Sequence, residues 1–171
     1  MSHIIQRPAV FLDRDGVLNR DYGFVFQVED LTWCDGAETA VRRLNDLNYL
    51  VFVITNQSGV ARGYYDEAAV VTFHQEMQRH LATCDAHIDE YVYCPHHPEG
   101  REPRYAIECH CRKPAPGMIE GLIQRWPIDR SQSFLIGDRE TDMQAAAAAN
   151  IPGHLFDGGD LNEFLNSRLN N

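Results

Sequence analysis

The stretch PAVFLDRDG, residues 8–16, joins an apolar run directly to a pair of aspartates. The run from Pro8 to Leu12 is short and is followed by polar, turn-rich sequence, a pattern that is typical of a buried strand. The run stops at Asp13, so a carboxylate stands at the expected carboxyl end of the strand. In open α/β sheets that edge is where ligands bind. The stretch therefore predicts both a central strand and the place of a site.

The same pattern recurs along the chain, with apolar runs alternating with segments of helical periodicity. Asp35 and Asp66 are candidate N-caps for the first two helices. Strict alternation predicts an α/β fold, a Rossmann-like three-layer sandwich around a central, mostly parallel sheet. Besides 8–12, the predicted strands are 49–55, 90–94, 133–138 and 153–156, and the predicted helices are 37–47, 66–83, 117–126, 141–150 and 161–169.

Length and charge narrow the class of protein. The 171 residues predict one domain over 1–171, with the loop 94–111 inserted in it. A formal net charge of −10 argues against nucleic-acid and membrane binding, although local cations can still hold a phosphorylated small molecule. No apolar run is long enough for a membrane span, and Met1–Arg7 has no signal-peptide core. We expect a cytoplasmic protein and, because no exposed apolar stripe stands out, a monomer.

Three polar residues follow predicted strands at their carboxyl ends: Asp13, Thr55 and Asp138. Because the carboxyl ends of parallel strands meet at one edge of the sheet, these residues are expected to converge. Asp13 and Asp15 are two residues apart, and two carboxylates ionise together only with a cation between them. Oxygen ligands of this kind suit Mg2+, with Asp138 completing the set. The alternative is that DRDG is only a turn; an EF-hand loop is excluded because Gly16 is the fourth residue, not the sixth.

The order of the polar motifs favours phosphoryl transfer over a turn. A carboxylate such as Asp13 can attack phosphorus and form an aspartyl-phosphate. Thr55 can donate a hydroxyl hydrogen bond, and Lys113, the only lysine of the chain, can supply a point charge to the phosphoryl oxygens. Asp15 can protonate the leaving oxygen and then deprotonate water. A solvated Lys113 with no such role is the alternative.

The segment CPHHPEGREPRYAIECHCRKPAPG, residues 94–117, gathers thiols and imidazoles. Its ligands Cys94, His96, Cys109 and Cys111 form a Cys3His set of the kind that holds tetrahedral Zn2+. His97 and His110 are competing ligands that spacing does not exclude, and a Cys109–Cys111 disulfide is the weaker rival. A metal would order a segment that has no hydrophobic pattern, and would fix Arg112 and Lys113 at the sheet edge.

Four motifs together, FLDRDG, VITN, CRKPAPG and IGDRETD, resemble the haloacid dehalogenase superfamily of phosphohydrolases over about residues 8–150. The resemblance implies that Asp13 is the nucleophile and Asp15 the acid and base, with Thr55 and Lys113 holding the phosphoryl group. It also implies that Mg2+ is bound by Asp13, Asp138 and the backbone carbonyl of Asp15, with Asp142 supporting the metal. No segment is long enough for the cap domain that members often carry, so we expect a capless enzyme.

Longer motifs, FLDRDGVLNRDYGFV, TNQSGVARG, CPHHPEG and CRKPAPGM, resemble the D-glycero-D-manno-heptose 1,7-bisphosphate 7-phosphatases. The resemblance implies removal of the 7-phosphate, giving heptose 1-phosphate for lipopolysaccharide core or other heptose glycans. Phe24 stands where tyrosine is common and Arg139 where lysine is, which changes the contacts available there. The substrate contacts implied are Asp21, Tyr22, Gly23, Phe24, Thr55, Asn56, Gln57, Ser58, Arg112, Lys113 and Arg139.

Two alternatives remain beside the heptose phosphatase. One is a histidinol-phosphate phosphatase, which shares the fold and a shorter zinc loop. The other is a non-catalytic phosphosugar-binding protein of the same fold, which the intact Asp13, Asp15, Lys113 and Asp138 disfavour. The remaining cysteines, Cys34 and Cys84, are expected to be small buried residues without chemistry.

Overall fold

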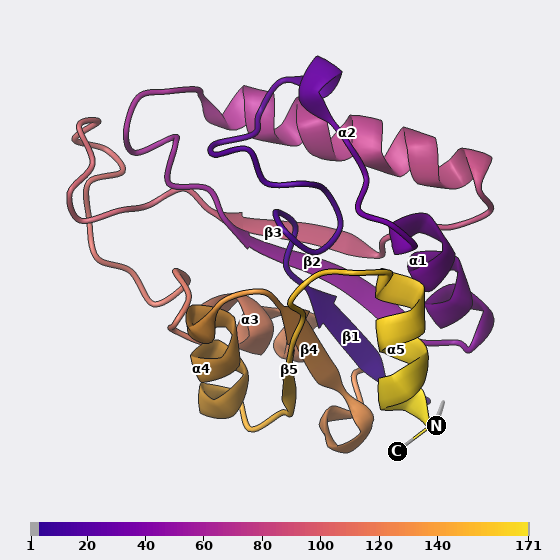
Figure 1. Ribbon diagram of the computed structural model, residues 1–171. Coiled ribbons are helices and arrows are strands. Elements are labelled where there is room, and N and C mark those ends of the chain that lie inside the picture. The colour runs from indigo at the N-terminus through magenta and orange to yellow at the C-terminus, as the bar shows by residue number, and fades with distance from the viewer. Residues whose placement is uncertain (1–3, 171) are drawn as a thin grey trace.

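A five-stranded parallel sheet forms the centre of the computed structural model, which describes residues 4–170 (Figure 1). The strands lie in the order β3-β2-β1-β4-β5, and every neighbouring pair is parallel. All five predicted strands are confirmed, and the sheet is parallel throughout. Their bounds are β1 (Ala9–Leu12), β2 (Leu50–Asn56), β3 (Glu90–Cys94), β4 (Phe134–Gly137) and β5 (Gly153–Leu155).

Five α-helices cover the two faces of the sheet and confirm the three-layer sandwich (Figure 1). Side chains alternate along β1, so that Val10 and Leu12 join one buried core while Ala9 and Phe11 join the other. The first core includes residues of α1, α2 and α5, and the second those of α3 and α4. The helices are α1 (Ala37–Asp46), α2 (Glu67–Thr83), α3 (Gly117–Arg125), α4 (Glu140–Ala148) and α5 (Leu161–Leu169).

Two 3-10 helices were not predicted, because three residues are too few to show a period. They are η1 (Val28–Asp30) and η2 (Arg130–Gln132). Within residues 4–170, η1 is the only helix between β1 and α1, and neither helix nor strand lies between β3 and α3. Neither connection therefore builds a second folded unit over the sheet edge, as expected for a capless enzyme.

One of the two predicted helix caps is confirmed and the other is wrong. The Asp66 side chain accepts a hydrogen bond from the Ala69 amide at the start of α2. The N-cap of α1 is Gly36 instead of Asp35, and Asp35 pairs with Arg20 at 3.2 Å. Gly36 has a φ of 75°, and a Cβ there would lie 2.2 Å from Oδ1 of Asp160. Tertiary packing against the start of α5 thus sets the beginning of α1.

The two cysteines outside the zinc-ligand group differ from the prediction. Cys34 and Cys84 are half-buried and not buried: Cys34 lies at the margin of the first core, and Cys84 caps the carboxyl end of α2. Their burial was inferred from residue type alone, which does not report distance from the core.

As for membranes, none of the helices in residues 4–170 has the length and apolar character that a span requires.

The strand order fixes the place of the site. The chain runs from β1 outward to β2 and β3 on one side, then returns to build β4 and β5 on the other. A crevice opens at the carboxyl ends of the strands where the order reverses, here beside β1. Asp13 follows β1 and its amide donates to the Ile136 carbonyl of β4 at 3.1 Å. Asp138 follows β4, and Thr55 is the penultimate residue of β2.

Candidate active site

A cavity of about 440 Å³ opens at this edge of the sheet. It is lined by nearly all the residues that the sequence indicated, from four separate segments. Asp138 is not a lining residue, although its carboxylate is close to those of Asp13 and Asp142. Tyr22, an expected substrate contact, is 65% exposed and also outside the lining. The expected residues in the lining are Asp13, Asp15, Asp21, Gly23, Phe24, Thr55, Asn56, Gln57, Ser58, Arg112, Lys113, Arg139 and Asp142.

Three carboxylates meet at the floor of the cavity. Asp13, Asp138 and Asp142 each offer an oxygen within 4.8 Å of the others. Burial raises the pKa of Asp13 to about 8 against the pull of Lys113, with Asp142 adding to the rise. Oδ1 of Asp138 is buried without a hydrogen-bond partner in the described part of the chain. An unpaired buried oxygen within a crowd of carboxylates suits a divalent cation.

Glycine is required where the turn after β1 approaches this floor. Gly16 has a φ of 87°, which disfavours any residue with a side chain. A Cβ at Gly16 would lie 2.1 Å from Oδ2 of Asp138. Glycine at position 16 therefore allows the turn to approach the Asp138 carboxylate without a steric clash.

Lys113 lies in the cavity floor with its side chain 3% exposed. Its Nζ is 3.0 Å from Oδ1 of Asp13, 2.6 Å from Oδ1 of Asp142 and 2.9 Å from the Ile54 carbonyl. Burial opposes the charge, but the two carboxylates prevail and raise the pKa of Lys113. The ammonium group therefore stays charged, and it fixes the carboxylates that surround it.

The Asp15 carboxylate is anchored on both oxygens. Oδ1 accepts hydrogen bonds from Nε and Nη2 of Arg14, at 3.1 and 2.8 Å, and from Nδ2 of Asn19 at 2.9 Å. Oδ2 accepts from Nε2 of Gln57 at 3.1 Å. Arg14 is fully buried and also touches the His74 ring at 3.2 Å. The carboxylate is thus held in one orientation at the cavity wall.

The end of β2 contributes a second set of polar groups. Nε2 of Gln57 donates to Oγ1 of Thr55 at 2.9 Å as well as to Asp15. Asn56, expected as a substrate contact, exchanges two hydrogen bonds with the Lys113 backbone, at 3.0 and 3.1 Å. Both ends of the Asn56 amide are therefore occupied in joining β2 to the segment that carries Lys113.

The mouth of the cavity carries arginine and aromatic side chains. Arg139 pairs with Asp21 at 3.2 Å, which joins the start of α4 to the segment after β1. Phe24 has a φ of 51° and its ring meets that of Tyr64 edge-on at 4.9 Å. Arg112 is half-buried, and its Nη1 is 3.5 Å from the His96 carbonyl.

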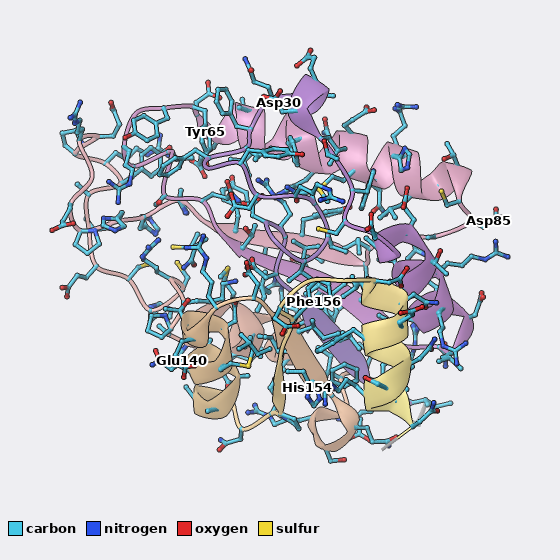
Figure 2. The ribbon with its side chains drawn as sticks, in the orientation of Figure 1. Asp30, Tyr65, Asp85, Glu140, His154 and Phe156 are labelled. Atoms are coloured by element: carbon cyan, nitrogen blue, oxygen red, sulfur yellow. The ribbon has the colours of Figure 1, made fainter. Side chains whose placement is uncertain are left out.

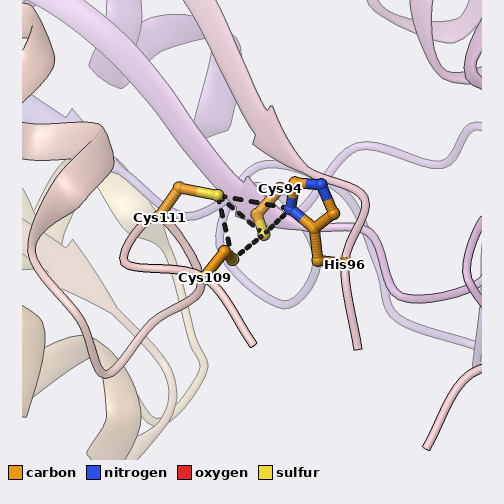
Figure 3. A group of neighbouring side chains, drawn as sticks. All are labelled: Cys94, His96, Cys109 and Cys111. Carbon is orange, nitrogen blue, oxygen red and sulfur yellow. Dashed lines mark hydrogen bonds between the residues drawn. The ribbon is translucent and has the colours of Figure 1, made fainter. Parts of the chain in front are cut away.

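The expected zinc ligands form one compact group beside the cavity (Figure 3). The sulfur atoms of Cys94, Cys109 and Cys111 are 3.1–3.3 Å apart, and Nδ1 of His96 is 3.5 Å from Cys94 and 3.6 Å from Cys111. Four donors of these types around one point suit a tetrahedral soft-metal site.

The rival ligands and the disulfide are absent from this arrangement. His97 uses Nδ1 to accept the Glu99 amide, and neither His97 nor His110 belongs to the ligand group. All five cysteines are free, and the Cys109 and Cys111 sulfurs are more than 1 Å farther apart than the roughly 2.05 Å of a disulfide.

Four cavity residues were not expected from the sequence: Arg62, Tyr65, Glu140 and Thr141. Arg62 stands in the SGVARG motif, which pointed to a family without pointing to this side chain. Oη of Tyr65 donates to Oε1 of Gln57 at 2.7 Å. Figure 2 shows Tyr65 in the segment that leads into α2 and Glu140 at the start of α4. Their places depend on how these segments fold back over the sheet edge, which no local pattern reports.

The sequence is similar to one protein-family model and to several named phosphatases. The family model described as "HAD-hyrolase-like" matches residues 110–163. The chain is 48% identical over 164 residues to the D-glycero-beta-D-manno-heptose-1,7-bisphosphate 7-phosphatase of Rhodopseudomonas palustris, covering 96% of this chain and 91% of that protein. It is 43% identical to the enzyme of the same name from Escherichia coli K12, over 84% of this chain and 75% of that one.

Solved structures agree with these relatives. The D,D-heptose 1,7-bisphosphate phosphatase of B. bronchiseptica, complexed with magnesium and phosphate, superposes with a TM-score of 0.80 at 33% identity, over 94% of this chain and 86% of that one. A putative HAD-like phosphatase from Mesorhizobium loti gives a TM-score of 0.84 at 33% identity, over 90% and 74% of the two chains.

Proposed function

The chain belongs to the family of the D-glycero-beta-D-manno-heptose-1,7-bisphosphate 7-phosphatases, and on that basis we propose that it removes the 7-phosphate of this bisphosphate. The product is the heptose 1-phosphate, and the relatives' names favour the β anomer. The observation that carries the proposal is the meeting of Asp13, Asp15, Thr55 and Lys113 around one cavity. These four residues supply a nucleophile, an acid and base, and two groups that bind phosphoryl oxygens.

Asp13 is the proposed nucleophile. Both hydrogen bonds that it accepts, from the Arg14 amide at 2.8 Å and from Lys113, go to Oδ1. The carboxylate is therefore fixed toward the cavity. It attacks the 7-phosphorus, the bond to the sugar oxygen breaks, and an aspartyl-phosphate forms. The ammonium group of Lys113 and the hydroxyl group of Thr55 hold the equatorial oxygens, on which the charge is spread.

Asp15 is the proposed acid and base. Its proton goes to the departing 7-oxygen of the sugar, and the carboxylate then takes a proton from the water that hydrolyses the aspartyl-phosphate. Two successive proton transfers need a carboxyl group that does not rotate. The contacts with Arg14, Asn19 and Gln57 supply that restraint.

Two metal sites complete the proposal. Asp13, Asp138 and the backbone carbonyl of Asp15 would hold Mg2+, with Asp142 supporting the set through its contact with Lys113. Mg2+ bound there would supply charge neutralisation to the phosphoryl oxygens. Zn2+ would be held by the other group, Cys94, His96, Cys109 and Cys111, and would be structural because four protein ligands leave no open position.

The second phosphate of the substrate calls for further cations. Arg112 and Arg139 line the cavity beside Lys113, and we assign the 1-phosphate and sugar hydroxyls to them together with Arg62. Nε of Arg62 is buried without a hydrogen-bond partner in the described part of the chain. Guanidinium groups suit this task because their planar forks match phosphate oxygens.

The test is phosphate release with Mg2+ from both anomers of the heptose 1,7-bisphosphate and from histidinol phosphate, compared side by side. Phosphorus NMR of the product tells which phosphate has left. We expect the β-anomer to be preferred and the 1-phosphate to remain. Preference for histidinol phosphate would contradict the substrate assignment but would agree with the proposed mechanism. If no phosphomonoester were hydrolysed, the assignment of the chain as a phosphatase would be wrong.

A further inference from the structure

Tyr65 is a cavity residue for which the mechanism above has no use. Its ring stacks on that of Phe26, with centroids 4.7 Å apart and planes at 16°. It also lies directly over Gly59, where a Cβ would be 2.1 Å from the ring. The stacking on Phe26 and the close approach to Gly59 together restrict the position of the Tyr65 side chain. That position points the hydroxyl group at Gln57.

A chain of hydrogen bonds runs from this hydroxyl group to two proposed catalytic residues. Oη of Tyr65 is 2.7 Å from Oε1 of Gln57. Nε2 of Gln57 then donates to Oδ2 of Asp15 at 3.1 Å and to Oγ1 of Thr55 at 2.9 Å. Gln57 is 2% exposed, so water does not compete for its amide group.

The direction of every bond in this chain is determined by donor and acceptor chemistry. The ionised Asp15 carboxylate only accepts, so in that state the nitrogen of the Gln57 amide faces Asp15. The amide oxygen therefore faces Tyr65, whose hydroxyl group must donate. Burial raises the pKa of Tyr65 to about 12, so this proton is retained at neutral pH.

The consequence falls on the hydroxyl group of Thr55. A hydroxyl group has one proton, and Oγ1 of Thr55 already accepts the N–H of Gln57. Its own proton is thus free to donate into the cavity. If the Gln57 amide rotated by half a turn, its oxygen would repel Asp15 and would draw the Thr55 proton away from the cavity.

We infer that Tyr65 is a positioning residue, which holds the Gln57 amide in the one orientation that turns the Thr55 hydroxyl proton toward the phosphoryl group and keeps Asp15 in place. The inference rests on the proposed phosphatase chemistry but not on the heptose substrate. Without the Tyr65 hydroxyl group, Oε1 of Gln57 is a buried acceptor with no donor, which weakens the preference for the amide orientation that Asp15 also favours.

The test is Tyr65→Phe, which keeps the stacked ring and removes one oxygen. We expect kcat to fall about tenfold, as for loss of one buried hydrogen bond, with KM changed less than about threefold. The loss should be equal for the heptose bisphosphate and for an aryl phosphate, because both use Thr55 and Asp15. In a Gln57→Ala background, Tyr65→Phe should have no further effect on kcat.

Tyr91 offers a matched control. Its hydroxyl group also donates to a glutamine oxygen, Oε1 of Gln78 at 3.1 Å, but outside the cavity. Tyr91→Phe should leave kcat unchanged while costing comparable thermal stability. The inference would be wrong if Tyr65→Phe were less stable but had wild-type kcat. It would also be wrong if the effects of Tyr65→Phe and Gln57→Ala on kcat were independent, so that the double variant showed the product of the two losses.

A readout without turnover separates this inference from the proposed function. The side-chain amide signals of Gln57 in a 15N NMR spectrum should shift, and exchange with water faster, in Tyr65→Phe. Unchanged signals would contradict the inference even if the chain hydrolysed no phosphate. Conversely, the chain could hydrolyse an aryl phosphate in a Tyr65-dependent way without hydrolysing the heptose bisphosphate. That result would support the inference and contradict the substrate assignment.

Discussion

Asp13 is a residue whose burial disfavours its charged form and which the proposed chemistry nevertheless requires as the nucleophile. Burial and neighbouring carboxylates raise the pKa of Asp13, so ionising this carboxyl group in the metal-free protein costs free energy through desolvation and electrostatic repulsion. An isosteric amide removes that repulsion along with the nucleophile. Asp13 is therefore expected to lower the free energy of unfolding of the metal-free protein, whereas its proposed catalytic role requires metal and substrate.

We accordingly expect Asp13→Asn to lose activity and keep its fold. Turnover should fall at least about 10⁴-fold, because an amide cannot form the acyl-phosphate. The thermal midpoint without metal should equal or exceed that of the wild type. Asp46→Asn, at an exposed ion pair with Arg42, is the control and should keep full activity. Wild-type turnover in Asp13→Asn would refute the nucleophile assignment.

Arg62 tests the proposed hold on the second phosphate. Its Nη2 is 3.4 Å from Nε2 of His97, and its guanidinium carbon is 5.9 Å from the centre of the Phe24 ring. We expect Arg62→Met to lower kcat/KM for the bisphosphate about 10- to 100-fold, as for loss of a charged hydrogen bond. The value for an aryl monophosphate should stay within about twofold.

The control for Arg62 is Arg101→Met, an exposed arginine that does not line the cavity. It should leave both substrates unaffected. Equal losses for the bisphosphate and the monophosphate in Arg62→Met would mean that Arg62 acts on the reacting phosphate or on the fold, and would contradict the assignment.

At the scale of elements, strands and helices were predictable and the folded connections were not. Buried strands such as 50–56 and caps such as Asp66 have local signals, namely an apolar run or an oxygen before a periodic segment. The Asp35 cap failed because the packing of Gly36 on Asp160 is long-range. Polar residues at strand ends predicted the floor of the site, whereas Arg62 and Tyr65 lie on connections whose path depends on contacts such as Tyr65 over Gly59.

The segment from Cys94 to Cys111 is the connection with the strongest local signal. Its few internal hydrogen bonds include those from the His97 amide to Tyr105 and from the Gly100 amide to His97. It is also attached to Ala61, whose carbonyl accepts the amides of Arg101 and Glu102, and to Glu67, whose carboxylate accepts the Tyr105 hydroxyl. A metal bound by the four-ligand group would hold the two ends of this segment together.

Removal of zinc should therefore loosen this segment and weaken catalysis. We expect a chelator under reducing conditions to increase hydrogen exchange over residues 95–111. It should also lower kcat/KM, because Arg112 and Lys113 directly follow the last ligand. Cys109→Ser should lose zinc by metal analysis, and Cys84→Ser should retain it. Carefully reduced wild-type protein with no zinc would refute the site.

At the scale of the molecule, the charge distribution separates the cavity from the rest of the surface. The chain carries a formal net charge of −10, yet Arg62, Arg112, Lys113 and Arg139 all line one cavity. Two of these, Lys113 and Arg139, pair with carboxylates of the same cavity. In the proposed function, the guanidinium groups of the other two, Arg62 and Arg112, bind an incoming anion. Local cations thus give an acidic protein a place for a phosphorylated substrate without making it adhere to nucleic acid.

The free energy of unfolding should depend on pH through His74. This ring is 5% exposed, stacks on Tyr91 and contacts the Arg14 guanidinium. Burial, followed by the charge of Arg14, lowers the pKa of His74 to about 3, while an unfolded chain protonates it near 6.5. Between these values the unfolded state binds more protons, so stability is present above pH 6.5 and is lost as the pH falls toward 3. From pH 8 to pH 5 the wild type should lose about 2 kcal/mol more than His74→Gln in urea unfolding. His87→Gln, at an exposed histidine, should lose as much as the wild type, and parallel losses in the wild type and His74→Gln would show that His74 does not carry the effect.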